Sequence, residues 1–152
     1  MHRLVLLLFG AVIMLLPGAR EPVLFMGIRR AEPTPLHDAI VYMVGWCLGR
    51  DASVYRLDGW ATAEQIILVE SRVPVYGVTI MNEDSTALIV IERDAWLHPG
   101  VISHELIHLF TGATLADRAS PTWRCEMQLP LGLPGRAPLS PDSLATLLER
   151  AA

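Results

Sequence analysis

The segment His104-Glu105-Leu106-Ile107-His108 is the sequence feature that most constrains the fold of this chain. Residues four apart lie on one face of a helix, so the two imidazoles share a side only if this segment is helical. Pro99 suits the first turn of such a helix, Gly112 suits its end, and His98 is expected at its start rather than in a site. We therefore predict a helix over residues 101–111. A second face carries an apolar stripe that predicts packing against a sheet: Ile102, Leu106, Leu109 and Ala113.

The same segment predicts a metal site. A catalytic zinc ion has three protein ligands and keeps one position for water, and His104 and His108 are candidates for two of those ligands. Glu105 lies between them and is the candidate general base, because it can take a proton from water that the metal activates and pass it to a leaving amine. The pattern predicts Zn²⁺-dependent hydrolysis of peptide bonds, with a peptide or protein as substrate. The alternative is a catalytically inactive binding or structural module in the cell envelope.

The third metal ligand is a carboxylate in this interpretation, because no histidine follows His108. Asp117 lies shortly after Gly112, and a chain that reverses at this glycine would return Asp117 to the metal. Glu126 lies further along and would suit a ligand on a second helix, but Pro121 interrupts the approach. We predict Asp117 as the third ligand and keep Glu126 as the alternative.

The N-terminus has the layout of an export signal. A short cationic start, Met1-His2-Arg3, precedes an apolar run over residues 4–16 and the helix-breaking Pro17-Gly18-Ala19. We predict a signal peptide over residues 1–19, followed by a single domain over residues 20–152. The alternative is an uncleaved anchor in which residues 4–16 tether the chain to a membrane. Either interpretation makes the protein secreted, or periplasmic or otherwise resident in the cell envelope.

Cysteine content and charge agree with this location. In an exported protein, Cys47 and Cys125, the two cysteines of the chain, predict one disulfide, with two buried free thiols as the alternative. The net charge of −4 and the absence of any run of Lys or Arg exclude a typical nucleic-acid binder.

The rest of the chain predicts a mixture of helices and strands. We expect a loose leader over residues 21–35, and then a helix over 36–48 with Ile40, Met43, Val44 and Cys47 on its apolar stripe. Strands are expected over 52–57, 65–70, 73–81 and 86–92, with a bulge at Gly77 and a hairpin between the last two. A Pro-rich linker over 130–135 precedes a short C-terminal helix over 140–149.

Residues 87–125 resemble the zincin-like metallopeptidases, including small exported bacterial members of that class. The resemblance depends on a strand, the two-histidine segment, a Gly-terminated helix end, a metal ligand, and an aromatic residue followed by a cysteine: Ile89-Val90-Ile91, His104 to His108, Leu109-Phe110-Thr111-Gly112, Asp117, and Trp123-Arg124-Cys125. It implies a zincin-like α+β fold, with a small antiparallel or mixed sheet packed on an N-terminal helix and an active-site helix. It also implies a cleft bordered by an edge strand. These relatives usually have His where this chain has Asp117.

Overall fold

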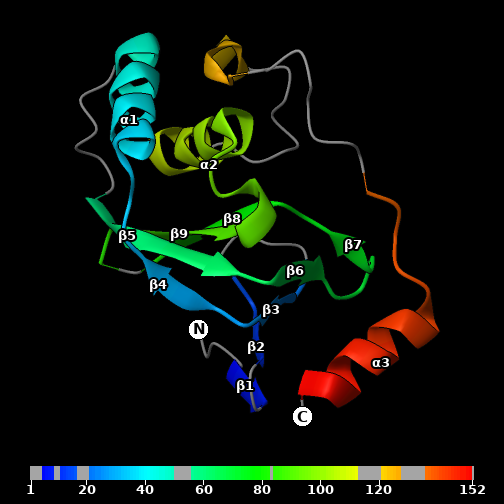
Figure 1. Cartoon of the computed structure of the whole chain (residues 1–152). Helices are drawn as coiled ribbons and strands as arrows, with labels where there is room; N and C mark the ends of the chain where they lie inside the picture. Colours follow the sequence, from blue (N-terminus) through cyan, green and yellow to red (C-terminus); the bar gives the residue numbers. More distant parts are fainter. Residues whose placement is uncertain are drawn as a thin grey trace.

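The chain folds into two small β-sheets and three α-helices within the residues that the structure describes (Figure 1). This arrangement confirms the predicted α+β class. No helix in this described part is long and apolar enough to cross a membrane. The computed structural model describes residues 5–8, 11–16, 21–49, 56–82, 84–112, 121–127 and 136–151.

A four-stranded mixed sheet positions the functional residues. Its order is β4 (Arg29–Ala31), β5 (Arg56–Ala63), β9 (Thr86–Glu92) and β8 (Gly77–Met81). Strands β5 and β9 are parallel, whereas the other two pairs are antiparallel. The β8–β9 hairpin confirms the predicted pairing of these two segments, and it makes β8 the last strand at one side of the sheet.

A second sheet is antiparallel throughout. Its order is β1 (Val5–Leu8), β2 (Ala11–Met14), β3 (Val23–Met26), β6 (Gln65–Leu68) and β7 (Val73–Pro74). The pair β3–β6 continues into the pair β4–β5, so one two-stranded ribbon bends from this sheet into the other. The bend contains Gly27 at φ +61°, where a Cβ would lie 2.8 Å from Glu64 Cγ. Only glycine satisfies both the backbone angle and this close approach.

Two expectations about the strands are wrong. The segment over residues 21–35 is no loose leader, because it contains β3 and β4, and Leu24 and Phe25 are fully buried. The expected strand over 73–81 divides into β7 and β8, which lie in different sheets, so Gly77 begins β8 and forms no bulge. Of the strand expected over 52–57, residues 52–55 lie outside the described residues, and Arg56 and Leu57 begin β5, which extends to Ala63. These short strands are stabilised by pairing and packing with distant parts of the chain, so their local sequence pattern does not identify them.

The apolar N-terminal run contains two of the strands. Strand β2 pairs with β3, and Ala11 and Leu16 are buried with 2% and 7% of their surfaces exposed. The assignment of residues 1–19 as a signal peptide or anchor stays a prediction.

Strand β9 is buried on both faces, which explains its uninterrupted apolar sequence. Ala87, Ile89 and Ile91 pack with residues of α1 and α2, whereas Val90 packs on the opposite side with residues of β3 and β6. Figure 1 shows the two helices together on one face of the four-stranded sheet. The candidate site residues of α2 therefore lie on a helix that packs against a strand buried on both faces.

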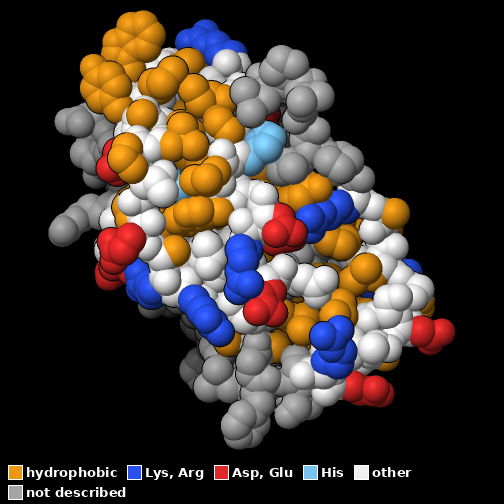
Figure 2. Space-filling view, in the orientation of Figure 1, with side chains coloured by type: hydrophobic (Ala, Val, Ile, Leu, Met, Phe, Trp, Pro, Cys, Tyr) orange, Lys and Arg blue, Asp and Glu red, His pale blue; other side chains and the backbone are white. Residues whose placement is uncertain are grey.

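Helix α1 (Pro35–Leu48) confirms the predicted N-terminal helix and ends at Gly49, which has φ +64°. Ile40 and Val44 are buried, as the stripe predicts, but Met43 is 49% exposed. Met43 lies one residue before Val44, so it turns away from the line that Ile40 and Val44 define. With Tyr42 and Trp46 it contributes to a hydrophobic area over α1 (Figure 2).

The C-terminal helix α3 (Pro141–Ala151) also confirms its prediction. Its leucines pack against the five-stranded sheet, beside Leu24 and Ile67. The predicted linker over 130–135 lies outside the described residues. After it, Arg136 donates hydrogen bonds to both carboxylate oxygens of Glu92 and lies 3.8 Å above the ring of Tyr76. The contact with Glu92 raises the pKa of Arg136 above its usual value.

Candidate metal centre

Helix α2 (Pro99–Thr111) presents the two histidines as predicted. His98 is the N-cap residue, Pro99 is in the first turn, and Gly112 ends the helix at φ +64°. The Gly112 N–H donates to the main-chain oxygen of His108 at 2.9 Å. Three members of the predicted stripe, Ile102, Leu106 and Leu109, are completely buried. The fourth, Ala113, lies outside the described residues.

The imidazoles of His104 and His108 converge through the same ring atom. Their Nε2 atoms lie 3.2 Å apart, and the two ring planes are nearly perpendicular at 80°. Two nitrogens at the usual zinc distance of about 2.0–2.1 Å, separated by a tetrahedral angle, would lie about 3.3–3.4 Å apart. The Nε2 pair therefore fits two positions of one tetrahedral zinc ion.

The carboxylate of Glu105 is directed to the edge strand β8. Only 3% of Glu105 is exposed, and Oε2 accepts a hydrogen bond from Thr79 Oγ1 at 2.8 Å. Gly77 permits this approach, because a Cβ there would lie 2.8 Å from Oε1 and 2.9 Å from Cγ of Glu105. Gly77 and Thr79 were not among the predicted site residues, although a glycine at the start of an apolar strand is a signal of close packing.

Glu126 contacts His104 on the other side of the ring. Its Oε1 lies 2.8 Å from His104 Nδ1, which is the nitrogen that does not face His108. In metal sites, a carboxylate at this ring nitrogen orients the imidazole. The alternative role of Glu126 as the third ligand stays a prediction.

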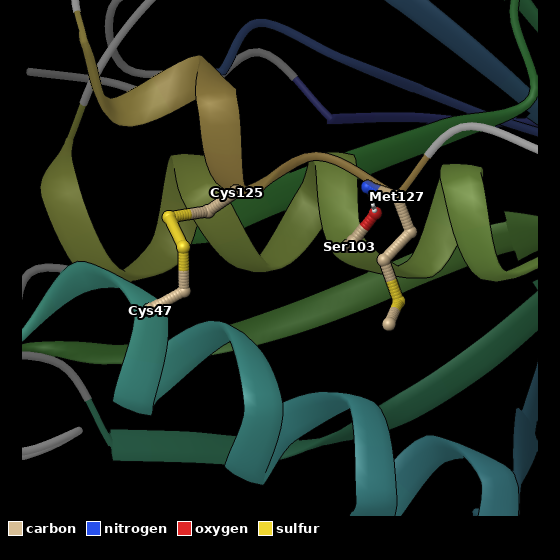
Figure 3. Close-up of a disulfide and its surroundings, with 4 residues drawn as sticks. All are labelled: Cys47, Ser103, Cys125 and Met127. Atoms are coloured by element: carbon tan, nitrogen blue, oxygen red, sulfur yellow. Dashed lines mark hydrogen bonds between the residues drawn. A yellow bond between two sulfur atoms is a disulfide. The ribbon is translucent and has the colours of Figure 1, made fainter.

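Trp123 closes one side of the histidine pair. Its ring centroid lies 4.8 Å from that of His104 and 5.2 Å from that of His108, and the residue is 8% exposed. Trp123 belongs to the short 3₁₀ helix η3 (Pro121–Cys125), which the sequence analysis marked only through the resemblance. The next cysteine in this element, Cys125, forms the predicted disulfide with Cys47 of α1 (Figure 3).

The predicted third ligand, Asp117, cannot be placed beside the two histidines. It lies in a segment outside the described residues, so its assignment stays a prediction. Across residues 5–8, 11–16, 21–49, 56–82, 84–112, 121–127 and 136–151, no three side chains of His, Cys, Asp or Glu are grouped to bind a metal ion. Among these residues, the candidate ligands that lie together are the two histidine nitrogens of His104 and His108.

His37 is a core residue rather than part of this centre. It is completely buried, and its ring lies 4.8 Å from that of Trp60 and 4.1 Å from that of Trp96. The main-chain N–H of Thr34 donates to Nδ1 at 3.2 Å. Burial lowers the pKa of His37 below 6.5, and contacts with the Trp96 backbone and the nearby Asp38 offset part of that effect.

Comparisons with known proteins give no family for the chain. No protein-family model, no curated protein and no solved structure matches it. Its function has to be inferred from the residues and from the geometry of α2, β8 and η3.

Proposed function

We propose that this protein is a zincin-like, zinc-dependent hydrolase of peptide bonds, in which His104 and His108 bind Zn²⁺ and Glu105 is the general base. The observation that supports this function best is the convergence of the two Nε2 atoms at 3.2 Å on a capped, well-packed helix. Asp117 stays the predicted third ligand. The donor set of two imidazoles and one carboxylate is one that catalytic zinc sites use.

The chemistry divides between the metal and the chain. Zinc, when bound, would supply a Lewis acid for the substrate carbonyl and would make water a better nucleophile at neutral pH. A carboxylate oxygen of Glu105 takes the proton from the attacking water and then donates it to the nitrogen of the leaving amine. Thr79 and Gly77 fix the position of that carboxylate, which limits the reorganisation needed for proton transfer.

The neighbouring strand supports a peptide as the substrate. Strand β8 is the last strand in its sheet and contacts Glu105 through Gly77 and Thr79. An extended peptide can add to such a strand through main-chain hydrogen bonds, independently of its sequence. Peptide binding beside β8 would bring a scissile bond next to the proposed base.

The proposed location is outside the cytoplasmic membrane, as a secreted, periplasmic or envelope protein. The disulfide between Cys47 and Cys125 supports this proposal, because such bonds persist mainly in oxidising compartments. The apolar run over residues 4–16 supports it independently.

One observation favours the alternative function of an inactive binding or structural module. Glu105 is 3% exposed and is bound by Thr79, an arrangement that also suits a buried structural carboxylate. The two functions share the metal site and differ only in whether Glu105 transfers a proton.

The deciding experiment measures zinc content and peptide cleavage on the same preparations. The full chain, purified under oxidising conditions, is analysed for zinc and incubated with a peptide library, with Glu105→Gln and the control Glu70→Gln treated in parallel. Glu70 is an exposed glutamate distant in sequence from α2. For the hydrolase, Glu105→Gln should retain zinc and lose about 100-fold to 10,000-fold in cleavage rate, as removal of a general base does.

The other outcomes are equally informative. Stoichiometric zinc without cleavage by the unmodified protein would support the inactive module. A protein that binds no zinc at micromolar metal would disprove both functions.

A further inference from the structure

We infer that the segment Pro121–Met127 is the outer shell of the metal centre, in which Glu126 is a positioning residue for His104 and the Cys47–Cys125 disulfide secures that position. This inference rests on the proposed function, because an outer shell requires that His104 binds the metal. It assigns a role to Glu126, to Trp123 and to the disulfide that the proposed reaction does not need.

The contact between Glu126 and His104 sets the tautomer of the imidazole. An ionised carboxylate only accepts hydrogen bonds, so at 2.8 Å the proton between the two groups belongs to Nδ1 of His104. A neutral imidazole protonated at Nδ1 has its lone pair on Nε2, the atom that faces His108. The Glu126 contact therefore prepares the nitrogen that the proposed metal would use.

Trp123 restricts the two rings further. The indole lies tilted by 34° over the ring of His104 and nearly perpendicular, at 79°, to the ring of His108. Side chains that are confined before the metal arrives lose less conformational entropy on binding it. Glu126 fixes one ring by a hydrogen bond, and Trp123 fixes both by contact.

Two further attachments bind this segment to the rest of the fold. Cys125 lies next to Glu126 in the chain and is bonded to Cys47 of α1. The main-chain N–H of Met127 donates to Ser103 Oγ at 2.8 Å (Figure 3). The same hydroxyl donates to the main-chain oxygen of Gly100 at 3.1 Å. Glu126 thus lies between a covalent attachment and a hydrogen-bonded one.

Gly100 is part of the same attachment. A Cβ at this position would lie 2.7 Å from the main-chain oxygen of Met127, so any other residue would displace the segment. Alanine at a helical position usually stabilises a helix relative to glycine. Gly100→Ala should therefore favour α2 itself while it moves Glu126 away from His104.

The inference predicts changes in zinc affinity that follow the position of Glu126. Loss of such an outer carboxylate typically lowers metal affinity by about 10-fold to 100-fold. We expect this loss for Glu126→Leu, and a smaller one for Glu126→Gln, whose amide oxygen can still accept from Nδ1. Gly100→Ala and the double variant Cys47→Ala/Cys125→Ala should also lower the affinity, although they change no proposed ligand.

The experiment combines two measurements on the full chain. Zinc affinity is determined by competition with a chromophoric chelator, with Glu149→Gln on α3 as the control for a lost surface carboxylate. The tautomer of His104 is determined in the metal-free protein from its imidazole ¹⁵N shifts. The unmodified protein should show the Nδ1–H form, and Glu126→Leu should shift His104 toward the Nε2–H form while the backbone spectrum stays folded.

The outcomes separate this inference from the proposed function. If the unmodified protein binds zinc and neither Glu126 variant changes affinity or tautomer, the outer-shell role is wrong and the metal site stands. If the unmodified protein binds no zinc, the proposed function fails, and the outer-shell role fails with it. If Glu126→Leu does not fold, the near-isosteric Glu126→Gln decides by the same two measurements.

Discussion

Thr79 binds Glu105 at two points. Its hydroxyl oxygen lies 2.8 Å from the side-chain Oε2 of Glu105 and 2.9 Å from the main-chain oxygen of the same residue. A hydroxyl has one proton, so the donation is shared between the two acceptors. This contact connects the edge strand β8 directly to the residue between the two histidines.

Replacement of Thr79 by valine should therefore destabilise the protein and misplace Glu105. The variant keeps the β-branched shape but leaves a buried carboxylate without one of its donors, which costs about 1–3 kcal/mol in free energy of unfolding. Urea denaturation at neutral pH measures this change. Thr62→Val on β5 is the matched control and should change stability by less than about 0.5 kcal/mol. Equal effects of the two variants would contradict a specific role for the Thr79 hydroxyl.

Gly77→Ala should disturb the same carboxylate by direct overlap. The new methyl group would lie 2.8 Å from Oε1 of Glu105, and overpacking of this kind costs about 1–3 kcal/mol. Gly59→Ala is the control, because its methyl group would meet only the Arg30 side chain, whose exposed end can move. Denaturant midpoints of the two variants provide the comparison.

A double-mutant cycle tests the cause of the Gly77 effect. In a Glu105→Ala background the clash is removed, so Gly77→Ala should cost less there than in the unmodified protein. A coupling energy near zero would show that the cost of Gly77→Ala arises elsewhere.

Sequence reasoning located the helix of the site but not its surroundings. The helix was predicted from signals that lie within a few residues of one another: the two histidines, Pro99 and Gly112. Such local signals define the ends of a helix well. Thr79 and Gly77 reach Glu105 only because β8 pairs with β9 and packs on α2, and the glycine signals close packing without identifying Glu105 as its neighbour. For the same reason β3 and β4 were missed, since each pairs with a strand from a distant part of the sequence, β3 with β6 and β4 with β5.

The pair Glu92–Arg136 should contribute strongly to stability. Glu92 is 4% exposed, so Arg136→Met leaves a buried carboxylate without its cation, which we expect to cost about 3 kcal/mol. The exposed pair Arg30–Asp58 offers the control, because Arg30→Met should cost less than about 1 kcal/mol. Chemical denaturation of both variants checks the contrast. Adding Glu92→Gln to Arg136→Met should recover part of the loss, and a further loss would disprove this explanation.

His37 should make the protein less stable in mild acid. Because burial lowers its pKa below 6.5, the unfolded chain binds a proton at pH values where the folded protein does not. Stability is then complete above about pH 6.5 and falls with decreasing pH, by at most about 1.4 kcal/mol per pH unit, until the folded pKa is reached. Unfolding free energies between about pH 7.5 and pH 5 should fall less steeply for His37→Gln than for the unmodified protein. Parallel curves for the two proteins would contradict the assignment.

The disulfide joins residues that are synthesised at very different times. Cys47 and Cys125 are separated by 78 positions, and everything in α2 and β9 lies between them. A growing chain emerges from its N-terminus, so both histidines are available to fold onto the sheet before Trp123 and Glu126 exist outside the ribosome. Any metal that binds during synthesis would meet unrestrained imidazoles, whereas the finished protein presents them already oriented. The covalent link between α1 and η3 can therefore form only after both histidines have been synthesised.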